Sequence, residues 1–408
     1  MDMPTASDLL PLEDALARLL AAAPAPPEAE IVPLRQALKR VLAQECRSRW
    51  AVPPHDNSAV DGYAVAIADL GKGSLPVRQR IAAGDSPRAH LPGSASRIFT
   101  GAAIPAGADA VVMQEQTKLA GENVTLLQAP TAGQNIRPRG QDLPAGGHAL
   151  DAGTRLRPQE LGLLASIGMA ELAVHRKLRV AILTTGNELI PPGQSLAPGQ
   201  IYNTNRFSLL GLLDGLQLDV VDCGDVADTA EATREALRQA AKRADVIITT
   251  GGVSVGEEDH VREAIESLGQ LELWRLAIKP GKPLAFGHIE RTPVLGLPGN
   301  PAAVLVTFLM LARPFLLKMQ GMKGALTPHP VPLPAHFSVP LAGNRREFMR
   351  VLCQQDAEGQ AYLEAHPNQS SGMLSSAAWA SGLAVIQEGR TLKLGESVPY
   401  YSFDELLS

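Results

Sequence analysis

Residues 177–326 alternate short apolar runs, rich in β-branched residues, with amphipathic stretches of helical spacing. The apolar runs are LRVAILTTG, LDVVDCGDV, ADVIITTGG and TPVLGLPGNP. Strands that alternate with helices along a chain pair in parallel, so this pattern predicts a doubly wound, mostly parallel sheet. Because ligands bind beyond the carboxyl ends of such strands, the residues that follow each run are the first candidates for a functional site.

The run IITTGGVSVGEED combines a buried strand with a glycine-rich, acidic continuation. Gly251 and Gly252 follow the strand directly, and Ser254, Gly256 and Asp259 come next. Glycines allow the backbone to approach a ligand closely and to turn its N–H groups toward anionic oxygens. A plain strand-to-loop turn explains the same glycines, and from this segment alone both interpretations stay open.

Further polar segments follow other strands or turns of the same unit. They are Gly186-Asn187-Glu188, Asp225 to Asp228, Lys279 to Lys282 and Pro298 to Pro301. Lysines that flank a Pro-Gly turn suit a phosphate or another oxyanion, although solvated surface lysines are an equal alternative. Carboxylates beside bound phosphates suit Mg²⁺, which takes oxygen ligands. Together these segments predict an enzyme that handles a phosphorylated small molecule with magnesium.

The rest of the chain predicts three more domains. Residues 1–50 and 150–176 carry leucines at helical spacing, including the stretch 34–42, and predict a discontinuous N-terminal helical domain for packing or dimerisation. Residues 51–149 hold short β-like runs punctuated by Gly and Pro, which predict an inserted β-rich domain. Residues 327–408 begin with a Pro/His-rich linker and continue as a small β domain, with a strand-like piece at 391–394.

The inserted domain contains polar loops of its own. Asp61 lies in PPHDNSAVDGYA, and Thr100 lies at the end of a β-like run. Arg137 and Asp142 share the irregular segment RPRGQD, which suits contact with an anion. Ordinary turns and exposed charged loops explain these segments as well.

Composition excludes several classes of protein. A net charge of −5 gives no basic footprint for nucleic acid. Three scattered cysteines form neither a disulfide framework nor a cysteine zinc site, which favours a reducing cytoplasm. The start of the chain lacks the pattern of a signal peptide, and the longest apolar run, 302–312, is too short to span a bilayer. No P-loop, GxSxG or HExxH motif occurs. We therefore expect a cytoplasmic protein that binds neither membrane nor nucleic acid.

Seven motifs, in order along nearly the whole chain, give it a specific resemblance to the MoeA family of molybdopterin molybdenumtransferases, which includes the E domain of gephyrin. They are PPHDNSAVDGYAV, FTGAAIPAGADAVV, RPRGQDLPAG, LTTGNEL, TTGGVSVGEED, KPGKPLAFG and LPGNPAA. The resemblance implies four domains in an elongated homodimer, with an α/β domain like that of the MogA/MoaB molybdopterin-binding proteins. It also implies Mg²⁺-dependent insertion of molybdate into adenylated molybdopterin, with release of AMP.

The resemblance assigns roles residue by residue. The residues it implies for catalysis are Asp61, Glu188, Asp228, Asp259 and Lys279, of which Glu188, Asp228 and Asp259 are also the implied metal ligands. The residues it implies for binding substrate are Thr100, Arg137, Asp142, Gly251, Gly252, Ser254, Gly256, Lys282, Pro298, Pro301, Arg350 and Ser371. Asp61, Thr100, Arg137 and Asp142 are expected to act across the dimer interface. A MogA-like protein and molybdoenzyme chaperones are the implied protein partners.

This chain departs from the family pattern at two of these motifs. His260 follows Asp259 where the family often has tyrosine, and Ala302-Ala303 follow PGNP where Val-Ser is common. No tyrosine or hydroxyl contact is expected from those positions. Two other functions stay open beside insertion: a MogA-like molybdopterin adenylyltransferase, which the α/β domain alone would support, and a non-catalytic scaffold like gephyrin. Glu188, Asp228, Asp259 and both lysines favour an enzyme over the scaffold.

Overall fold

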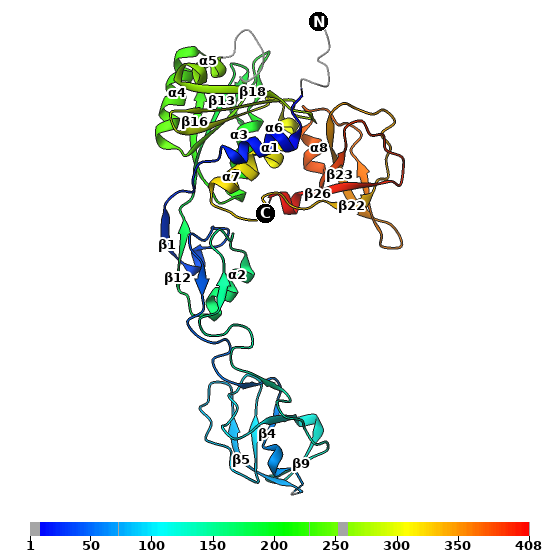
Figure 1. The fold of residues 1–408 in the computed structure, drawn as a ribbon. Helices are drawn as coiled ribbons and strands as arrows, with labels where there is room; N and C mark the ends of the chain where they lie inside the picture. The colour runs from blue at the N-terminus through cyan, green and yellow to red at the C-terminus, as the bar shows by residue number, and fades with distance from the viewer. Residues whose placement is uncertain (1–8, 72, 228, 252–259, 408) are drawn as a thin grey trace.

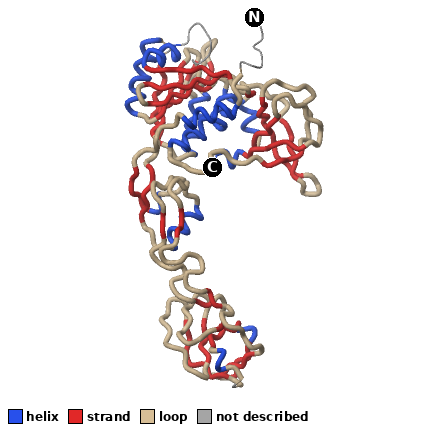
Figure 2. The backbone as a smooth tube through the Cα atoms, in the orientation of Figure 1, coloured by secondary structure: helices blue, strands red, loops and turns tan. Residues whose placement is uncertain are grey.

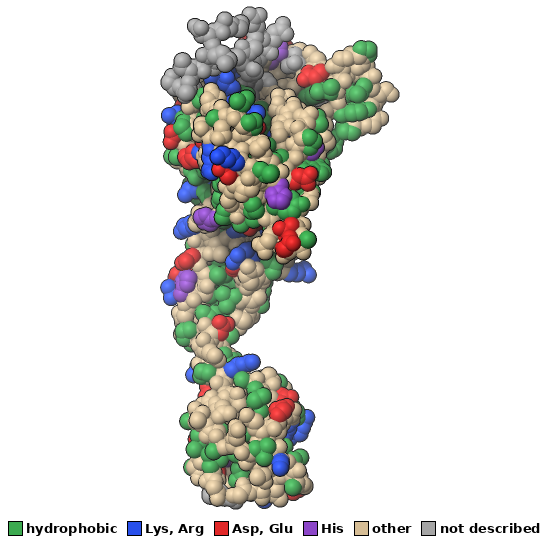
Figure 3. Space-filling view, turned by 90° about the vertical axis from the view of Figure 1, so that its right-hand side faces the viewer, with side chains coloured by type: hydrophobic (Ala, Val, Ile, Leu, Met, Phe, Trp, Pro, Cys, Tyr) green, Lys and Arg blue, Asp and Glu red, His purple; other side chains and the backbone are tan. Residues whose placement is uncertain are grey.

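The chain is elongated, and a computed structural model describes residues 9–71, 73–227, 229–251 and 260–407 (Figure 1). The α/β sheet and the C-terminal sheet lie side by side at one end. A small sheet with one helix lies in the middle, and a domain of strands and loops lies at the far end (Figure 2). A narrow neck joins that far domain to the rest (Figure 3). The chain is thus multidomain, as the sequence predicts.

The α/β sheet has the strand order β16-β13-β17-β21-β20-β18. Its strands are β13 (Arg179–Thr185), β16 (Asp219–Val226), β17 (Val246–Thr250), β18 (Gly269–Arg275), β20 (Pro283–Ile289) and β21 (Thr292–Leu297). The strands β16, β13, β17 and β21 pair in parallel. Strand β20 pairs antiparallel with both of its neighbours, β21 and β18. The sheet is therefore mixed, with a parallel part and an antiparallel edge, an arrangement common in doubly wound folds.

Helices cover both faces of this sheet because alternate residues of each strand point to opposite faces. On one face, Val180 and Ile182 pack with α1 (Leu12–Ala21), α3 (Thr204–Gly215), α6 (Pro301–Thr307) and α7 (Arg313–Met319). On the other, Ala181 and Leu183 pack with α4 (Ala230–Arg243) and α5 (His260–Leu268). The predicted doubly wound architecture is confirmed.

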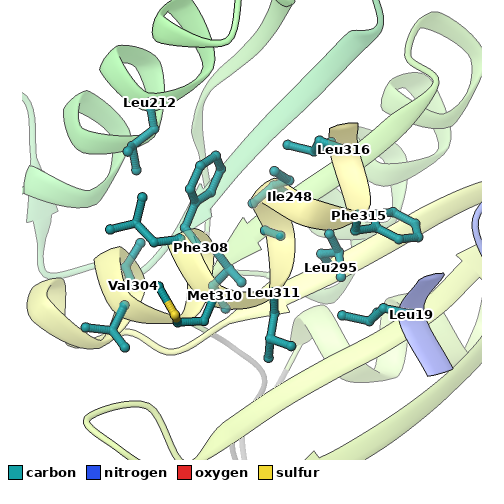
Figure 4. Close-up of a cluster of buried hydrophobic side chains, with 14 of the residues drawn as sticks. Leu19, Leu212, Ile248, Leu295, Val304, Phe308, Met310, Leu311, Phe315 and Leu316 are labelled. Carbon is teal, nitrogen blue, oxygen red and sulfur yellow. The ribbon is translucent and has the colours of Figure 1, made fainter. Parts of the chain in front are cut away.

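One long apolar segment forms the centre of the first face. A π-helical turn, Phe308–Ala312, joins α6 to α7, and Figure 4 shows its side chains beside Ile248, Leu295 and Leu19. By length and composition Pro301–Met319 could cross a membrane, but 89% of its apolar window is buried inside the protein. It is a core helix of the α/β domain.

The middle domain pairs β1 (Ala29–Pro33) with β12 (Glu171–His175) and carries α2 (Pro158–Ser166). The helix predicted over residues 34–42 is wrong. Only Leu34–Gln36 forms a 3-10 turn, Lys39 has a positive φ of 62°, and Leu42 bridges to Val174. Of the leucines spaced as in a helix, Leu42 is buried beside its cross-strand neighbour, whereas Leu38 is exposed. The preceding helix, α1, packs on α7 in the α/β core rather than in this domain.

The inserted domain is a six-stranded sheet of order β7-β4-β6-β5-β9-β8. Its strands are β4 (Gly62–Val65), β5 (Leu75–Ile81), β6 (Ala95–Ile98), β7 (Ala110–Met113), β8 (Thr117–Ala120) and β9 (Asn123–Leu126). Two pairs of short antiparallel strands connect it to the middle domain. They are β2 (Cys46–Arg47) with β11 (His148–Leu150) and β3 (Asn57–Ser58) with β10 (Ile136–Arg137).

The C-terminal sheet has the order β19-β23-β25-β26-β22, with β24 beside β23. Its elements are β19 (Ile278–Lys279), β22 (Val331–Pro334), β23 (Arg346–Gln355), β24 (Ala361–Ala365), α8 (Leu374–Trp379), β25 (Gly382–Ile386), β26 (Ser397–Ser402) and α9 (Phe403–Leu407). The predicted Pro/His-rich linker therefore contains an edge strand, where proline is tolerated. The strand expected at 391–394 is absent, and only Leu392 bridges to Val339.

Candidate active site

The carboxyl ends of β13, β17 and β21 meet at one edge of the α/β sheet. In the strand registers Thr184 lies beside Thr250, and Thr250 lies beside Leu297. The amide of Gly251 donates to the carbonyl of Leu297 at 3.4 Å. Residues 186–188, 251 and 298–301 leave the sheet at this edge, and we call them the rim. The predicted gathering of strand-end motifs is confirmed for these segments.

Glu188 projects from the rim after β13. Gly186 has a φ of +146°, which favours glycine, and a Cβ atom there would lie 2.6 Å from Oε2 of Glu188, so a larger residue would displace this carboxylate. The carbonyl of Glu188 accepts a hydrogen bond from the amide of Ile201 at 2.8 Å, which holds β14 (Leu189–Ile190) beside β15 (Ile201–Tyr202). Among the described residues, no cation lies within ion-pair distance of this exposed carboxylate. It is available to a ligand.

The start of α6 closes the rim from the other side. Nδ2 of Asn205 donates to the carbonyl of Gly299 at 2.7 Å, and a Cβ atom on Gly299 would lie 3.8 Å from Cα of Gly251. Pro298 is buried and Pro301 is the first residue of α6. The amide of Ala302 donates to the carbonyl of Ser371 at 3.0 Å. This contact brings Ser371, from the C-terminal domain, to the rim.

The Lys279–Lys282 turn lies against α6. Gly281 has a φ of +108°, and a Cβ atom there would lie 2.5 Å from Oγ1 of the buried Thr307. Nζ of Lys279 forms an ion pair with Oε1 of Glu347 at 2.9 Å, because β19 and β23 place these two residues side by side. Sequence reasoning missed Glu347, since no local pattern reveals a pairing between strands so distant along the chain.

Arg350 occupies a different place from the one we expected. Its side chain is 1% exposed, with Nε donating to Oγ of Ser376 at 3.1 Å and Nη2 donating to the carbonyl of Ser370 at 3.0 Å. Burial lowers the pKa of its guanidinium, and Glu347 opposes this shift. Arg350 therefore holds the segment that carries Ser371, rather than lying open to a ligand.

Asp61 and Thr100 contact each other directly in the inserted domain. Both the amide and the hydroxyl of Thr100 donate to Oδ1 of Asp61, at 2.8 and 2.7 Å. The hydrogen bond from the backbone amide of Thr100 lowers the pKa of Asp61 most, and the hydrogen bond from its hydroxyl lowers it further. Arg137 is exposed in β10 beside Asn57. The amide of Asp142, also exposed, donates to the carbonyl of Val52 at 2.9 Å. Within one chain this domain lies far from the rim (Figure 1).

Five candidate residues lie outside the described residues: Asp228, Gly252, Ser254, Gly256 and Asp259. Two of the three expected metal ligands are among them. Within the ranges that the structure covers, no group of three His, Cys, Asp or Glu side chains is arranged to hold a metal ion. Glu188 is thus the one expected metal ligand whose position is described.

Comparison with known proteins covers the chain from end to end. A family model described as the MoeA N-terminal region (domain I and II) matches residues 10–168, and one described as the MoeA C-terminal region (domain IV) matches residues 332–403. Between them, a probable molybdopterin binding domain matches residues 181–318. A molybdopterin molybdenumtransferase of Haemophilus influenzae is 39% identical over 98% of this chain and 100% of its own length. The chain belongs to the MoeA family of molybdopterin molybdenumtransferases.

Other relatives agree with this membership. A Nostoc molybdopterin molybdenumtransferase is 37% identical over 86% of this chain and 83% of its own length. A crystal structure described as molybdopterin biosynthesis moeA protein from Pyrococcus horikoshii OT3 superposes with a TM-score of 0.82 at 30% identity. It covers 97% of this chain and 100% of that one. The multidomain arrangement is therefore the MoeA fold.

Proposed function

We propose that this transferase inserts molybdate into adenylated molybdopterin and releases AMP, as a step of molybdenum cofactor biosynthesis. The observation that carries the proposal is that segments with three different chemical groups lie at the rim or against α6, which begins at the rim. The rim provides the Glu188 carboxylate, the adjacent turn carries Lys279 and Lys282, and the contact from Ala302 brings Ser371 alongside.

The glycines of the rim suit the phosphate-bearing part of the substrate. Gly251 and Gly299 lie almost in contact, and side chains at either position would narrow the space between β17 and α6. Backbone amides at such a place can face anionic oxygens without steric hindrance. We place the pterin phosphate region here, with Gly252, Ser254 and Gly256 continuing the same segment.

The lysines suit the second substrate, because molybdate is a tetrahedral dianion. Ammonium groups and hydroxyls bind such oxyanions through charge-assisted hydrogen bonds. Lys279 is exposed and Lys282 is half-buried, so both can reach a ligand at the turn. Release of AMP is a hydrolysis, in which water supplies the new oxygen on phosphorus as the linkage to molybdopterin breaks. Nearby ammonium groups stabilise the negative charge that develops on the leaving oxygen. In this scheme Lys279 and Lys282 hold the oxyanion, and Ser371 orients it.

The described carboxylate at the rim suits Mg²⁺. Glu188 is an exposed carboxylate that forms no ion pair with any described cation, and oxygen ligands of this kind are what Mg²⁺ takes. Asp228 and Asp259 are the other two ligands that we propose. Bound there, the ion would neutralise phosphate charge. Glu188 would hold and orient it.

Residues of the inserted domain require a second chain. Asp61 and Thr100 lie far from the rim of their own chain (Figure 1), so we propose a homodimer in which the partner's inserted domain supplies Asp61, Thr100, Arg137 and Asp142. We further propose that the enzyme works in the cytoplasm. A MogA-like protein would supply the adenylate, and molybdoenzyme chaperones would receive the product.

Reconstitution tests this function. The purified protein is mixed with adenylated molybdopterin, molybdate and Mg²⁺, and both AMP release and activation of an apo-molybdoenzyme are followed. We expect both signals to require molybdate and to be lost in Glu188→Gln and Lys279→Ala. Lys242→Ala, on the exposed side of α4, is the matched control and should retain both.

Other outcomes distinguish the remaining functions. ATP-dependent adenylation of molybdopterin by the pure protein would favour an adenylyltransferase. Binding of adenylated molybdopterin without AMP release or activation would favour a scaffold. A molecular mass equal to that of a monomer, measured by solution scattering, would contradict the proposed homodimer.

A further inference from the structure

A hollow lined by none of the rim residues lies where β19 joins the C-terminal sheet. Its volume is about 250 Å³. Lys279 of β19 lines one side of the hollow. Arg345 comes from the loop before β23, Glu347 from the start of β23, and Arg390 from the turn after β25. We call these four residues and the hollow between them the junction pocket.

The charges of the junction pocket are unbalanced. Three cations line it with one carboxylate, and Glu347 is already paired with Lys279 at 2.9 Å. Within the described part of the chain, neither Arg345 nor Arg390 has a carboxylate at ion-pair distance. Nη1 of Arg345 donates to the carbonyl of Ile278 at 3.2 Å, and Arg345 lines the hollow. Clustered guanidinium groups of this kind attract anions.

The backbone around the two arginines is fixed by hydrogen bonds. The amide of Arg346 donates to the carbonyl of Ala277 at 2.8 Å, which holds the neighbouring Arg345 against β19. The amide of Gly389 donates to the carbonyl of Gly343 at 2.7 Å, which ties the turn carrying Arg390 to the loop before β23. Arg345 and Arg390 therefore line the hollow from two connected segments. A ligand between them would meet a pocket whose backbone is already ordered, which lowers the entropic cost of binding.

We propose that the junction pocket binds a tetrahedral oxyanion, with Arg345 and Arg390 as its receptors. Planar guanidinium forks match the oxygens of such anions, and the hollow is large enough for one of them with water. Glu347 competes with the anion for Lys279, so binding draws Lys279 away from its carboxylate partner. Molybdate, sulfate and phosphate share this chemistry. Naming molybdate as the physiological ligand rests on the proposed function, whereas the binding site itself does not.

Isothermal titration calorimetry of the full-length protein, without molybdopterin, tests the site. Sodium molybdate, sulfate and phosphate are titrated separately into wild type, Arg345→Met, Arg390→Ala and the double variant. We expect each single substitution to weaken binding about tenfold and the double variant to abolish it. Glu347→Gln should tighten binding several-fold, because Lys279 loses its competing partner. Lys393→Ala, an exposed lysine of the same domain outside the pocket, should bind like wild type.

Arg390 is exposed and Arg345→Met keeps most of the packing volume, so at least one variant should fold normally. Preference for molybdate over sulfate and phosphate would support the site as a holding place for substrate, and equal binding would support a general oxyanion site. No binding by wild type up to about 10 mM would overturn the proposal. Wild-type affinity in the double variant would overturn it too, since the anion would then bind elsewhere. Failure of molybdate insertion with intact binding would count against the proposed function alone.

Discussion

Gly281→Ala should destabilise the α/β domain through a contact that can be isolated. The new Cβ atom would lie 2.5 Å from Oγ1 of Thr307 and 3.6 Å from the carbonyl of Ala303, in a backbone conformation with φ of +108°. The backbone conformation alone costs an L-residue on the order of 1–3 kcal/mol. Overpacking against α6 adds roughly 1–3 kcal/mol. We therefore expect a loss of about 2–6 kcal/mol in the free energy of unfolding.

Thr307→Ala separates the two parts of this cost. Thr307 is fully buried, and its hydroxyl has no hydrogen-bond partner among the described residues. Its removal relieves an unsatisfied polar group while losing one methyl group, so the single substitution should change stability by about 1 kcal/mol or less. In the Thr307→Ala background the overlap disappears, and Gly281→Ala should cost only the backbone part. The coupling energy of the double-mutant cycle should be about 1–3 kcal/mol.

Fluorescence of Trp274 during urea unfolding measures these differences. Trp274 is buried in the same core as α6, whereas Trp50 is exposed and Trp379 partly so; both are replaced by phenylalanine. A probe in one domain is needed because a multidomain chain does not unfold in two states. Equal costs of Gly281→Ala in both backgrounds would refute the overlap with Thr307. A cost below about 1 kcal/mol would refute the backbone argument as well.

Three further predictions concern charged groups. Burial raises the pKa of Asp245, but hydrogen bonds from Arg176 and Arg179 outweigh it and leave the pKa lowered. Its stabilisation is therefore complete above the unfolded value of about 3.9 and is lost as pH falls through the lower folded value. Asp245→Asn should cost about 1–2 kcal/mol at neutral pH, discounted for partial exposure, and progressively less below about pH 4, as urea midpoints will show. A constant difference across pH would contradict this. Arg350→Met should speed exchange of the Ala302 amide, which donates to the carbonyl of Ser371, about tenfold, measured by mass spectrometry, and unchanged protection would show that Arg350 does not hold the segment. Thr100→Val should raise the pKa of Asp61, because the hydrogen bond from the hydroxyl is lost while the one from the backbone amide stays. Carboxyl NMR measures this pKa, and an unchanged value would mean that the hydroxyl does not lower it.

The parallel part of the sheet was predictable because its information is local. Runs such as Arg179–Thr185 are apolar on both faces, and buried parallel strands have this composition. The rim followed from the general rule that such strands present ligands at their carboxyl ends. Glu188 and the Lys279–Lys282 turn were singled out as candidates in this way, without any knowledge of the tertiary contacts.

Contacts between distant segments were not predictable. The pairing of Lys279 with Glu347 depends on the register of β19 and β23, and the approach of Ser371 depends on one hydrogen bond from Ala302. Burial of Arg350 depends on loop packing that no spacing reveals. Residues 34–42 show the opposite failure, since their leucines have helical spacing but Leu42 is buried beside Val174 of a neighbouring strand and Leu38 is exposed.

The two short strand pairs at the neck have a consequence for how this protein can be divided. Cys46 lies opposite Leu150 and Asn57 opposite Arg137, so the incoming and outgoing chains run within one strand spacing of each other. Topologically, everything beyond the neck is a long loop of a hairpin. A tight turn in its place would give a shortened chain that keeps the middle, α/β and C-terminal domains, together with the whole rim. The excised piece has its own core and closely spaced ends, so each half can be studied as a separate module.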